Sequence, residues 1–544
     1  MQHRSFHGVL PGATVRRVFR DTLLTGAIAA ATAAALAAPA SVCTPPIAAA
    51  PTTGALVVGN GTAASCTGAA LQAAIDASPL VTFHCGATPV TIPIYATLTV
   101  PATRSTVIDG GGKVTLDGGG RVRLIEMVHP DFRTNRAGLT LQHLTLSGGK
   151  ASGTRYVPPT ASNASCAFGW ADGGGGAIYV RDATLHVVDV AFRNNAAASP
   201  GPDVGGGAIY AVASLDVAIV GATFDGNSAS NGGAVGLLQS DGRFANDLFS
   251  NNRATGTGQN YVGGAATGCA GVAQANQGGA GGNGGALHID GGSDGAQTVC
   301  GSVFDTNTAN ELGGALFRTA DGPAQPTTFD RSRFHGNHAS KGGALYVQNA
   351  KPLVVTASTF DANVAASAGA AQLVSVTPQI TNTTFASNVA TLGVGGALVL
   401  SNASAAGWIN NTTFSGNQSS GGPGYFAAAI FGTLAMPVNN TVFANNLSKD
   451  GGSPMQCFFT PGVGSADVQW PQKRPVGGLV DNVCVTGIRV VDPQLGALAS
   501  SGGPTPTVAP AATSPLRKAG HGCAATDQRG VARNTAACTI GAVE

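Results

Sequence analysis

One short pattern, a phenylalanine followed three residues later by an asparagine, recurs through the middle of this chain of 544 residues. Its nine copies begin at Phe192, Phe224, Phe249, Phe304, Phe334, Phe360, Phe385, Phe414 and Phe443. Most copies follow one another after 25 to 32 residues, but the step from Phe249 to Phe304 takes 55 residues and contains a Gly-rich insertion between Ala254 and Asn283. A period of this length indicates a repeat architecture in which each unit packs against its neighbours.

A second motif, Gly-Gly-Ala followed by apolar residues, is coupled to the first. Clear copies begin at Gly175, Gly206, Gly232, Gly313, Gly342 and Gly395, and degenerate copies at Gly369 and Ala427. Each repeat also offers two or three apolar runs of strand length, separated by Gly, Asn, Ser or Asp. A coil of about 25–30 residues accommodates three short strands at about 3.3 Å per residue. The sequence therefore predicts an all-β fold, a parallel β-solenoid.

Stacking explains why these residue types recur together. Coils lie about 4.8 Å apart, so equivalent residues sit above one another. We expect the phenylalanines to form an internal column and the asparagines an amide ladder, because an amide both donates and accepts hydrogen bonds. Gly-Gly-Ala would supply turn conformations and close backbone approach. A β-sandwich does not explain the joint recurrence of Phe and Asn, and the regular apolar runs oppose a disordered glycine-rich array.

The composition argues against a nucleic-acid-binding protein, a disordered chain and a mainly helical fold. The chain has 79 Gly, only 10% charged residues and a net charge of +2. A net charge this small provides no concentration of basic residues that would bind nucleic acid. The 43% share of hydrophobic residues argues against a disordered chain. Glu occurs only at positions 126, 311 and 544, and a chain so poor in good helix formers is not mainly helical.

The N-terminus predicts export. Arg4, Arg16, Arg17 and Arg20 precede an uncharged stretch that ends in Ala38-Pro39-Ala40, a pattern typical of a signal peptide cleaved after Ala40. A membrane anchor is the alternative, but the stretch is mostly weakly apolar Ala. No later segment is expected to span a membrane.

Ten cysteines remain after such cleavage, and export with an even count favours disulfides. Sequence proximity suggests Cys66 with Cys85, Cys457 with Cys484, and Cys523 with Cys538, although connectivity cannot be deduced from sequence. No Cys-x-x-Cys occurs, which argues against zinc.

The coupled motifs resemble the polymorphic outer-membrane protein repeat of bacterial surface proteins. The resemblance covers roughly residues 173–446 and implies a right-handed parallel β-helix. Before it, the glycine-rich runs at 107–120 and 139–149 resemble the first coils of such helices. The segment CTGAALQAAI, from Cys66 to Ile75, reads as a short amphipathic helix that would cap the open first coil.

The tail resembles the C-terminal region of bacterial choice-of-anchor Q proteins. The residues that carry this likeness are Asp492-Pro493-Gln494-Leu495-Gly496, then Gly502-Gly503-Pro504-Thr505-Pro506-Thr507, and finally Cys538-Thr539-Ile540-Gly541. The resemblance implies attachment to a cell surface, but no sorting motif follows, so the mode of attachment is left open.

Candidate catalytic residues are few. Gly520-His521-Gly522 matches a short polygalacturonase signature, but the Asn-Thr-Asp and Asp-Asp strings of that family are absent. His335-Gly336-Asn337-His338 offers a metal pair, although it falls on a repeat turn where polar residues are expected. Acidic residues near coil turns are interpreted as turn formers rather than calcium ligands; they are Asp172, Asp203, Asp241, Asp294, Glu311 and Asp321.

These observations predict a signal peptide at 1–40, a cap region at 41–105, a β-helix at 106–450 and a C-terminal module at 451–544. We expect an exported, surface-associated adhesin or envelope scaffold without catalytic, cofactor-binding or metal-binding residues. The alternative is a carbohydrate-active β-helix enzyme, a polysaccharide lyase or glycoside hydrolase. The expected partners are polysaccharides or host and cell-surface ligands, with no nucleic acid, and the expected state is a monomer. The expected location is extracellular or at the outer-membrane surface, with the periplasm as an alternative.

Overall fold

The computed structural model describes residues 41–152, 156–157, 167–168, 173–198, 204–256, 281–292, 294–322, 325–420, 427–453, 455–458 and 461–544. The predicted signal peptide and the central part of the glycine-rich insertion, 257–280, therefore lie outside the described residues. The described residues belong to one compact unit.

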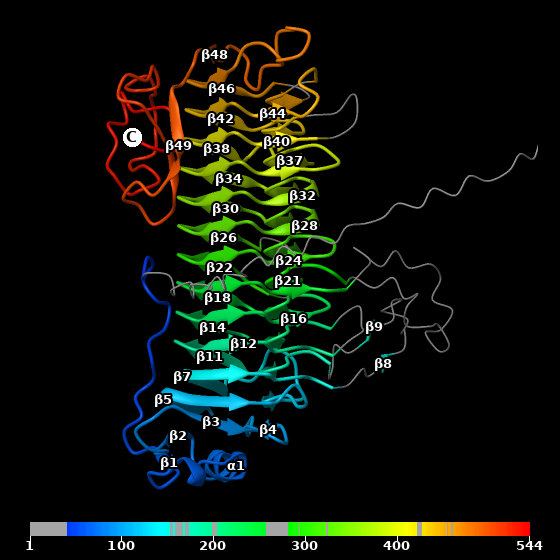
Figure 1. The fold of residues 1–544 in the computed structure, drawn as a ribbon, viewed down its shortest axis with the longest axis vertical. Helices are drawn as coiled ribbons and strands as arrows, with labels where there is room; N and C mark the ends of the chain where they lie inside the picture. The colour runs from blue at the N-terminus through cyan, green and yellow to red at the C-terminus, as the bar shows by residue number, and fades with distance from the viewer. Residues whose placement is uncertain are drawn as a thin grey trace, which may run out of the picture. The chain divides into compact units, whose positions relative to one another are not determined.

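The fold is an all-β parallel solenoid of about 12 turns, as predicted. Figure 1 shows the coils stacked from β1 and α1 at one end to β48 at the other. Each complete coil contributes one strand to sheet B, two to sheet A and one to sheet C, and neighbouring coils pair in parallel.

Sheet A contains 26 strands in two adjacent runs, which share the long strands β5 (Thr106–Asp117) and β7 (Gly138–Ser147). The other strands of run 1 are β1 (Leu56–Val58), β2 (Leu80–Phe83), β11 (Thr184–Val188), β14 (Val217–Val220), β18 (Gly242–Ala245), β22 (Gln297–Cys300), β26 (Thr327–Asp330), β30 (Leu353–Thr356), β34 (Pro378–Thr381), β38 (Trp408–Asn410), β42 (Pro437–Asn439) and β46 (Val463–Ser465). The other strands of run 2 are β3 (Val90–Pro93), β12 (Ala191–Arg193), β15 (Thr223–Asp225), β19 (Leu248–Ser250), β23 (Val303–Asp305), β27 (Arg333–His335), β31 (Thr359–Asp361), β35 (Thr384–Ala386), β39 (Thr413–Ser415), β43 (Val442–Ala444), β47 (Val468–Trp470) and β48 (Arg489–Val490).

Sheets B and C complete the coils. Sheet B has 12 strands: β4 (Leu98–Thr99), β6 (Ile125–Val128), β10 (Ile178–Arg181), β13 (Ile209–Val212), β17 (Val235–Leu238), β21 (Leu287–Gly291), β25 (Leu316–Ala320), β29 (Leu345–Gln348), β33 (Ala371–Val374), β37 (Leu398–Ser401), β41 (Ile430–Phe431) and β45 (Cys457–Phe458). Sheet C has eight: β16 (Ser228–Ala229), β20 (Arg253–Ala254), β24 (Thr308–Ala309), β28 (His338–Lys341), β32 (Val364–Ser367), β36 (Val389–Ala390), β40 (Gln418–Ser419) and β44 (Leu447–Ser448). Two antiparallel pairs lie outside the coils: β8 (Tyr156–Val157) with β9 (Ala167–Phe168), and β49 (Leu495–Ala499) with β50 (Thr507–Pro510).

The predicted capping helix is α1 (Gly68–Ala77), which follows the 3-10 turn η1 (Ala63–Ser65). The Thr67 side chain caps α1 by accepting a hydrogen bond from the backbone N–H of Ala70. The helix buries Leu71 and Ile75 at the start of the continuous core. Within the described ranges, no helix is long and apolar enough to cross a membrane.

The predicted columns are present inside the solenoid. Successive repeat phenylalanines from Phe192 to Phe443 stack with ring centroids 4.6 to 5.2 Å apart and nearly parallel planes. Phe249 stacks directly on Phe304 at 4.7 Å, so the long step in the repeat is a single coil that carries an insertion.

The repeat asparagines form the predicted amide ladder. The Asn307 Nδ2 donates to Asn337 Oδ1 in the next coil and to the carbonyl of Phe249 in the previous one, both at 3.0 Å. Its Oδ1 accepts from the backbone N–H and Nδ2 of Asn252, at 3.0 and 2.9 Å. Gly-Gly-Ala has both expected roles: Gly313 has a φ of 65°, and a Cβ on Gly314 would lie 2.0 Å from the Gly343 carbonyl oxygen.

A bend between the two runs of sheet A, called here the A bend, places one residue per coil at positive φ. These residues are His143, Asp189, Gly221, Asn246, Gly301, Arg331, Ala357, Asn382, Asn411, Asn440 and Ala466. The two ends of the described chain bind along it: an N-terminal strap (residues 41–55) and a C-terminal arm (residues 491–544), which Figure 1 shows in blue and red.

Two side-chain amides of the solenoid hold the strap. Asn246 Oδ1 accepts from the backbone N–H groups of Val42 and Cys43, and Gln142 exchanges two hydrogen bonds with Ala50. A disulfide between Cys43 and Cys300 locks the first of these contacts.

The arm continues along the same bend. The Thr505 hydroxyl donates to the Ala357 carbonyl, Asn382 Nδ2 donates to the Thr526 carbonyl, and Asn411 Oδ1 accepts from the Ala524 N–H.

The three cysteine pairs suggested by proximity are confirmed: Cys66–Cys85, Cys457–Cys484 and Cys523–Cys538. The fourth disulfide, Cys43–Cys300, was not anticipated because its partners are 257 residues apart in sequence. Cys166 and Cys269 lie outside the described residues.

Replacing Asn307 by Ala should lower the free energy of unfolding by about 3 kcal/mol, because it leaves buried donors and acceptors on both neighbouring coils unpaired. Denaturant unfolding measures the change. Gln418→Ala is the control, since the Gln418 side chain is exposed and makes no hydrogen bond with the residues that the structure describes. This variant should change stability by no more than about 0.5 kcal/mol. Equal stability of the two variants would contradict a stabilising role for the ladder.

Removing the long-range disulfide with Cys43→Ala and Cys300→Ala should lower stability by about 2–4 kcal/mol and expose the strap to proteolysis. The double variant Cys523→Ala, Cys538→Ala opens a loop of only 15 residues and leaves the strap contacts in place. Mass spectrometry of limited digests should therefore find cleavage within 41–55 only in the first variant.

Candidate functional site

A cluster of charged side chains lies on the outer face of run 2. In β23, β27 and β31 the phenylalanine points into the core, so the residues on either side of it point outward. Asp305, His335 and Asp361 each follow that phenylalanine and are partners in the parallel register. They therefore occupy one column on three successive coils, about 4.8 Å apart. Arg333 projects from the neighbouring column of the middle coil.

Asp361 anchors the cluster. Its carboxylate accepts from Arg333 Nε at 2.9 Å and Nη2 at 2.7 Å, and lies 2.6 Å from His335 Nδ1. The Asp361 side chain is only 4% exposed, so these contacts are shielded from water. An ionised carboxylate only accepts hydrogen bonds, so His335 Nδ1 donates and the ring orientation is fixed.

The pKa values follow from this geometry. The hydrogen bond to Asp361 raises the pKa of His335, although burial opposes the shift. Burial pushes the pKa of Asp361 upward, but the hydrogen bonds from Arg333 and His335 outweigh it and leave the pKa lowered. In Asp305 burial prevails over the nearby positive charges, so its pKa is raised.

Asp305 faces the other side of the imidazole. Its Oδ1 lies 4.0 Å from His335 Nε2, which is beyond hydrogen-bond distance. Within the described part of the chain its carboxylate accepts no hydrogen bond. The outer face thus presents an oriented imidazole nitrogen, a carboxylate and the edge of a guanidinium group.

The sequence contains a pattern that could have revealed this cluster. The residue after each repeat phenylalanine is outward in every coil of run 2, and Asp, His and Asp occupy that position in three consecutive copies. Aligning the repeats on Phe-x-x-Asn would have brought the three residues together.

The structure separates the two histidines of the suggested metal pair. His335 lies on β27, whereas His338 lies exposed on β28 beyond the turn, and Asn337 between them is buried in the amide ladder. In the described ranges, the group of residues with metal-like spacing is Cys43, Cys300 and Asp330, and its two sulfurs form a disulfide.

Those acidic turn residues that the structure describes form hydrogen bonds with nearby residues. Asp241 accepts from Arg133 Nη2 at 3.0 Å and from the Gly295 N–H at 2.6 Å, and Asp321 accepts from the Thr319 hydroxyl at 3.0 Å. Glu311 follows β24, where its backbone N–H donates to the Gly282 carbonyl. Asp172 and Asp203 lie outside the described residues.

Asp294 has an unexpected partner. Its carboxylate lies 2.7 Å from Arg318 Nη1, and both side chains are fully buried. Arg318 occupies an inward position of β25 whose neighbours in the register are Ile289 and Val347. Burial lowers the pKa of Arg318 and raises that of Asp294, and Gln297 also donates to this carboxylate. The pair links a core position to the turn that follows β21.

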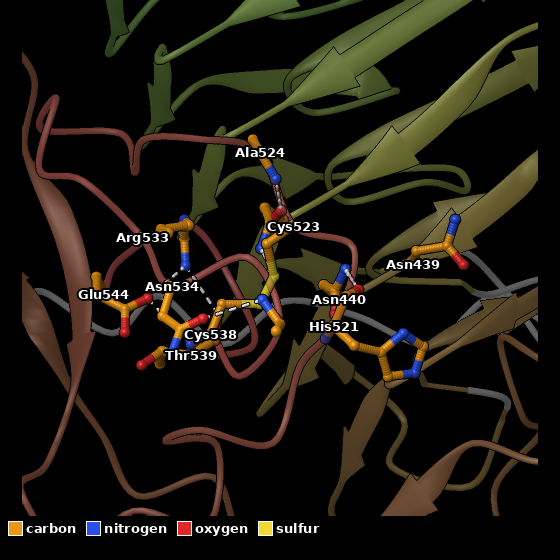
Figure 2. Close-up of a disulfide and its surroundings, with 12 residues drawn as sticks. Asn439, Asn440, His521, Cys523, Ala524, Arg533, Asn534, Cys538, Thr539 and Glu544 are labelled. Carbon is orange, nitrogen blue, oxygen red and sulfur yellow. Dashed lines mark hydrogen bonds and ion pairs between the residues drawn. A yellow bond between two sulfur atoms is a disulfide. The ribbon is translucent and has the colours of Figure 1, made fainter.

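Figure 2 shows His521, the middle residue of the Gly520-His521-Gly522 signature, near the Cys523–Cys538 disulfide of the C-terminal arm. The His521 backbone N–H donates to Asn440 Oδ1, and the His521 carbonyl accepts from Asn440 Nδ2. The imidazole is exposed and points away from the disulfide. In this structure the tripeptide docks the arm on the A bend.

Comparison with known proteins adds little about function. No family model and no curated protein matches the chain. Among solved structures, the chain is similar to PfbA, a surface adhesin of Streptococcus pneumoniae, with 13% identity and a TM-score of 0.32 over 74% of this chain and 82% of that one. It is also similar to the A-module of the Azotobacter vinelandii mannuronan C-5 epimerase AlgE6, with 14% identity and a TM-score of 0.29 over 77% of this chain and 98% of that one.

His335 should titrate above the usual histidine pKa of about 6.5 in histidine-selective NMR, because Asp361 stabilises its protonated form. This ion pair stabilises the fold fully below pH 6.5, and its contribution is lost as the pH rises through the raised pKa. Asp361→Asn should move the His335 titration to lower pH and leave the other histidine resonances unchanged. An unchanged His335 midpoint in that variant would refute the assigned contact.

Proposed function

We propose that this protein is exported and acts at a cell surface as a non-catalytic binding scaffold, an adhesin or envelope protein that recognises polysaccharides or other surface molecules. It would act as a monomer without a cofactor. Its signal peptide would span residues 1–40, its cap region 41–105, its β-helix 106–450 and its C-terminal module 451–544. The four disulfides among the described residues support export, because such bonds form and persist in oxidising compartments.

The observation that carries the proposal is a polar column on the outer face of run 1. One residue per coil contributes a carboxylate, hydroxyl or amide in continuous register: Asp330, Thr356, Thr381, Asn410, Asn439 and Ser465. Hydroxyl and amide groups both donate and accept hydrogen bonds, as sugar hydroxyls do. A rigid surface that repeats every 4.8 Å or so suits a polymer whose own groups repeat.

An exposed aromatic ring stands beside this column. Trp408 projects outward from β38, is 39% exposed, and donates from its indole Nε1 to the Thr381 hydroxyl at 3.2 Å. Tryptophan combines a large apolar face with a polar edge, which suits stacking against a sugar ring.

A carbohydrate-active enzyme is the second candidate, and the His335 cluster favours it. An imidazole oriented through Nδ1 by Asp361, with Nε2 facing Asp305, has the arrangement of a base and an acid. Asp361, however, is occupied by three donors, so it does not supply the second free carboxylate that most glycosidases use.

The test is to incubate the purified oxidised protein with a glycan panel and with whole cells, and to measure both binding and turnover. Binding without new reducing or unsaturated ends supports the scaffold, whereas turnover supports the enzyme. Trp408→Ala should weaken glycan binding by roughly 3- to 10-fold, with Leu392→Ala, another exposed apolar residue, as the control. Absence of binding to every glycan and cell would refute the scaffold proposal.

A further inference from the structure

We propose that Arg333, His335 and Asp305 form a binding site for the carboxylate-bearing unit of an acidic polysaccharide. The inference rests on the proposed glycan-binding function and assigns to it a second site and a ligand class, the uronic acids.

The positive half of the site is a guanidinium group with one unused edge. Asp361 binds Arg333 through Nε and Nη2, which holds the planar group in a fixed orientation. Nη1 makes no hydrogen bond with any residue that the structure describes, and the side chain is 32% exposed. A guanidinium edge of this kind binds carboxylates with charge-assisted hydrogen bonds.

The negative half is Asp305. Its carboxylate and His335 Nε2 are 4.0 Å apart, too far for a direct hydrogen bond. A sugar hydroxyl between them can donate to Asp305 and accept from the protonated Nε2, which joins the two groups through the ligand. The site therefore matches a ligand that carries a carboxylate and a hydroxyl close together. Neutral sugars lack the carboxylate, and anions such as chloride or sulfate lack the hydroxyl.

Other histidine–aspartate pairs on the described surface lack this combination. His186 and Arg243 both bind Asp216, but no second carboxylate faces the imidazole. His143 lies between Asp109 and Asp189, but no arginine takes part. Of these clusters among the described residues, only the one at His335 combines a guanidinium nitrogen that has no hydrogen-bond partner with a carboxylate that accepts no hydrogen bond, both on the outer face of run 2.

The C-terminal arm borders the site. Thr359, the register partner of Arg333 in the next coil, donates from its hydroxyl to the Pro506 carbonyl at 2.6 Å. The neighbouring Thr384 hydroxyl donates to Gln528. A polymer bound at Arg333 would thus meet the arm on this side.

Isothermal titration of the full oxidised protein with a defined oligouronate and with the matching neutral oligosaccharide tests the proposal. The wild type should bind the oligouronate more tightly than the neutral compound. Arg333→Gln should weaken oligouronate binding at least 10-fold with little effect on the neutral compound. Asp305→Asn, which leaves the Arg333–Asp361 pair intact, should weaken binding by roughly 5-fold. His186→Gln is the matched control and should bind as the wild type does.

The melting temperature of each variant shows whether weaker binding results from loss of the site or from loss of the fold. If Arg333→Gln does not fold, the Asp305→Asn variant still tests the proposal. Equal affinity for acidic and neutral oligosaccharides, or unchanged binding in both variants, would overturn this site while glycan binding through the Trp408 face stands. A wild type that binds no glycan and no cell would overturn both proposals.

Discussion

Hydrogen bonding between stacked asparagine side chains fixes the relation of one coil to the next. Each amide in the ladder joins its own coil to both neighbours, and a shift of one residue would break every such contact. The phenylalanine column shares this register, so the core and the ladder select the same alignment. As a result, the outward residues of each strand are determined by their sequence distance from the phenylalanine, before it in run 1 and next to it in run 2. The polar column and the His335 cluster both depend on this alignment.

The predictable part of the fold is the part that repeats. The Phe and Asn columns, the Gly-Gly-Ala turns and the capping helix follow from period, residue size and hydrogen-bonding capacity. The Cys457–Cys484 pair could be suggested because a coil of 27 residues returns the chain close to its starting point. The pairs Cys66–Cys85 and Cys523–Cys538 could be suggested because their cysteines are only 19 and 15 residues apart. The repeat carries no information on the strap and the arm, which have no period of their own.

The His335 cluster was not predicted from the sequence, for a related reason. Asp305, His335 and Asp361 stand at a position that varies between repeats, so no single window of sequence contains them. Arg318 illustrates the same limit inside the core, where the pattern predicts an apolar residue like Ile289 or Val347. Its charge is tolerated because Asp294 reaches it from the turn that follows β21 in the previous coil, a contact that depends on the path of the loop. A buried charge without such a partner would be strongly destabilising.

The disulfide that fastens the strap also sets an order of events for a chain that emerges N-terminus first. During synthesis, Cys43 is added to the chain 257 residues before Cys300, whereas Cys66 and Cys85 follow it much sooner. Until the chain has been made as far as β22, Cys43 therefore has no correct partner. The last step in sealing the N-terminal half is therefore made by its first cysteine.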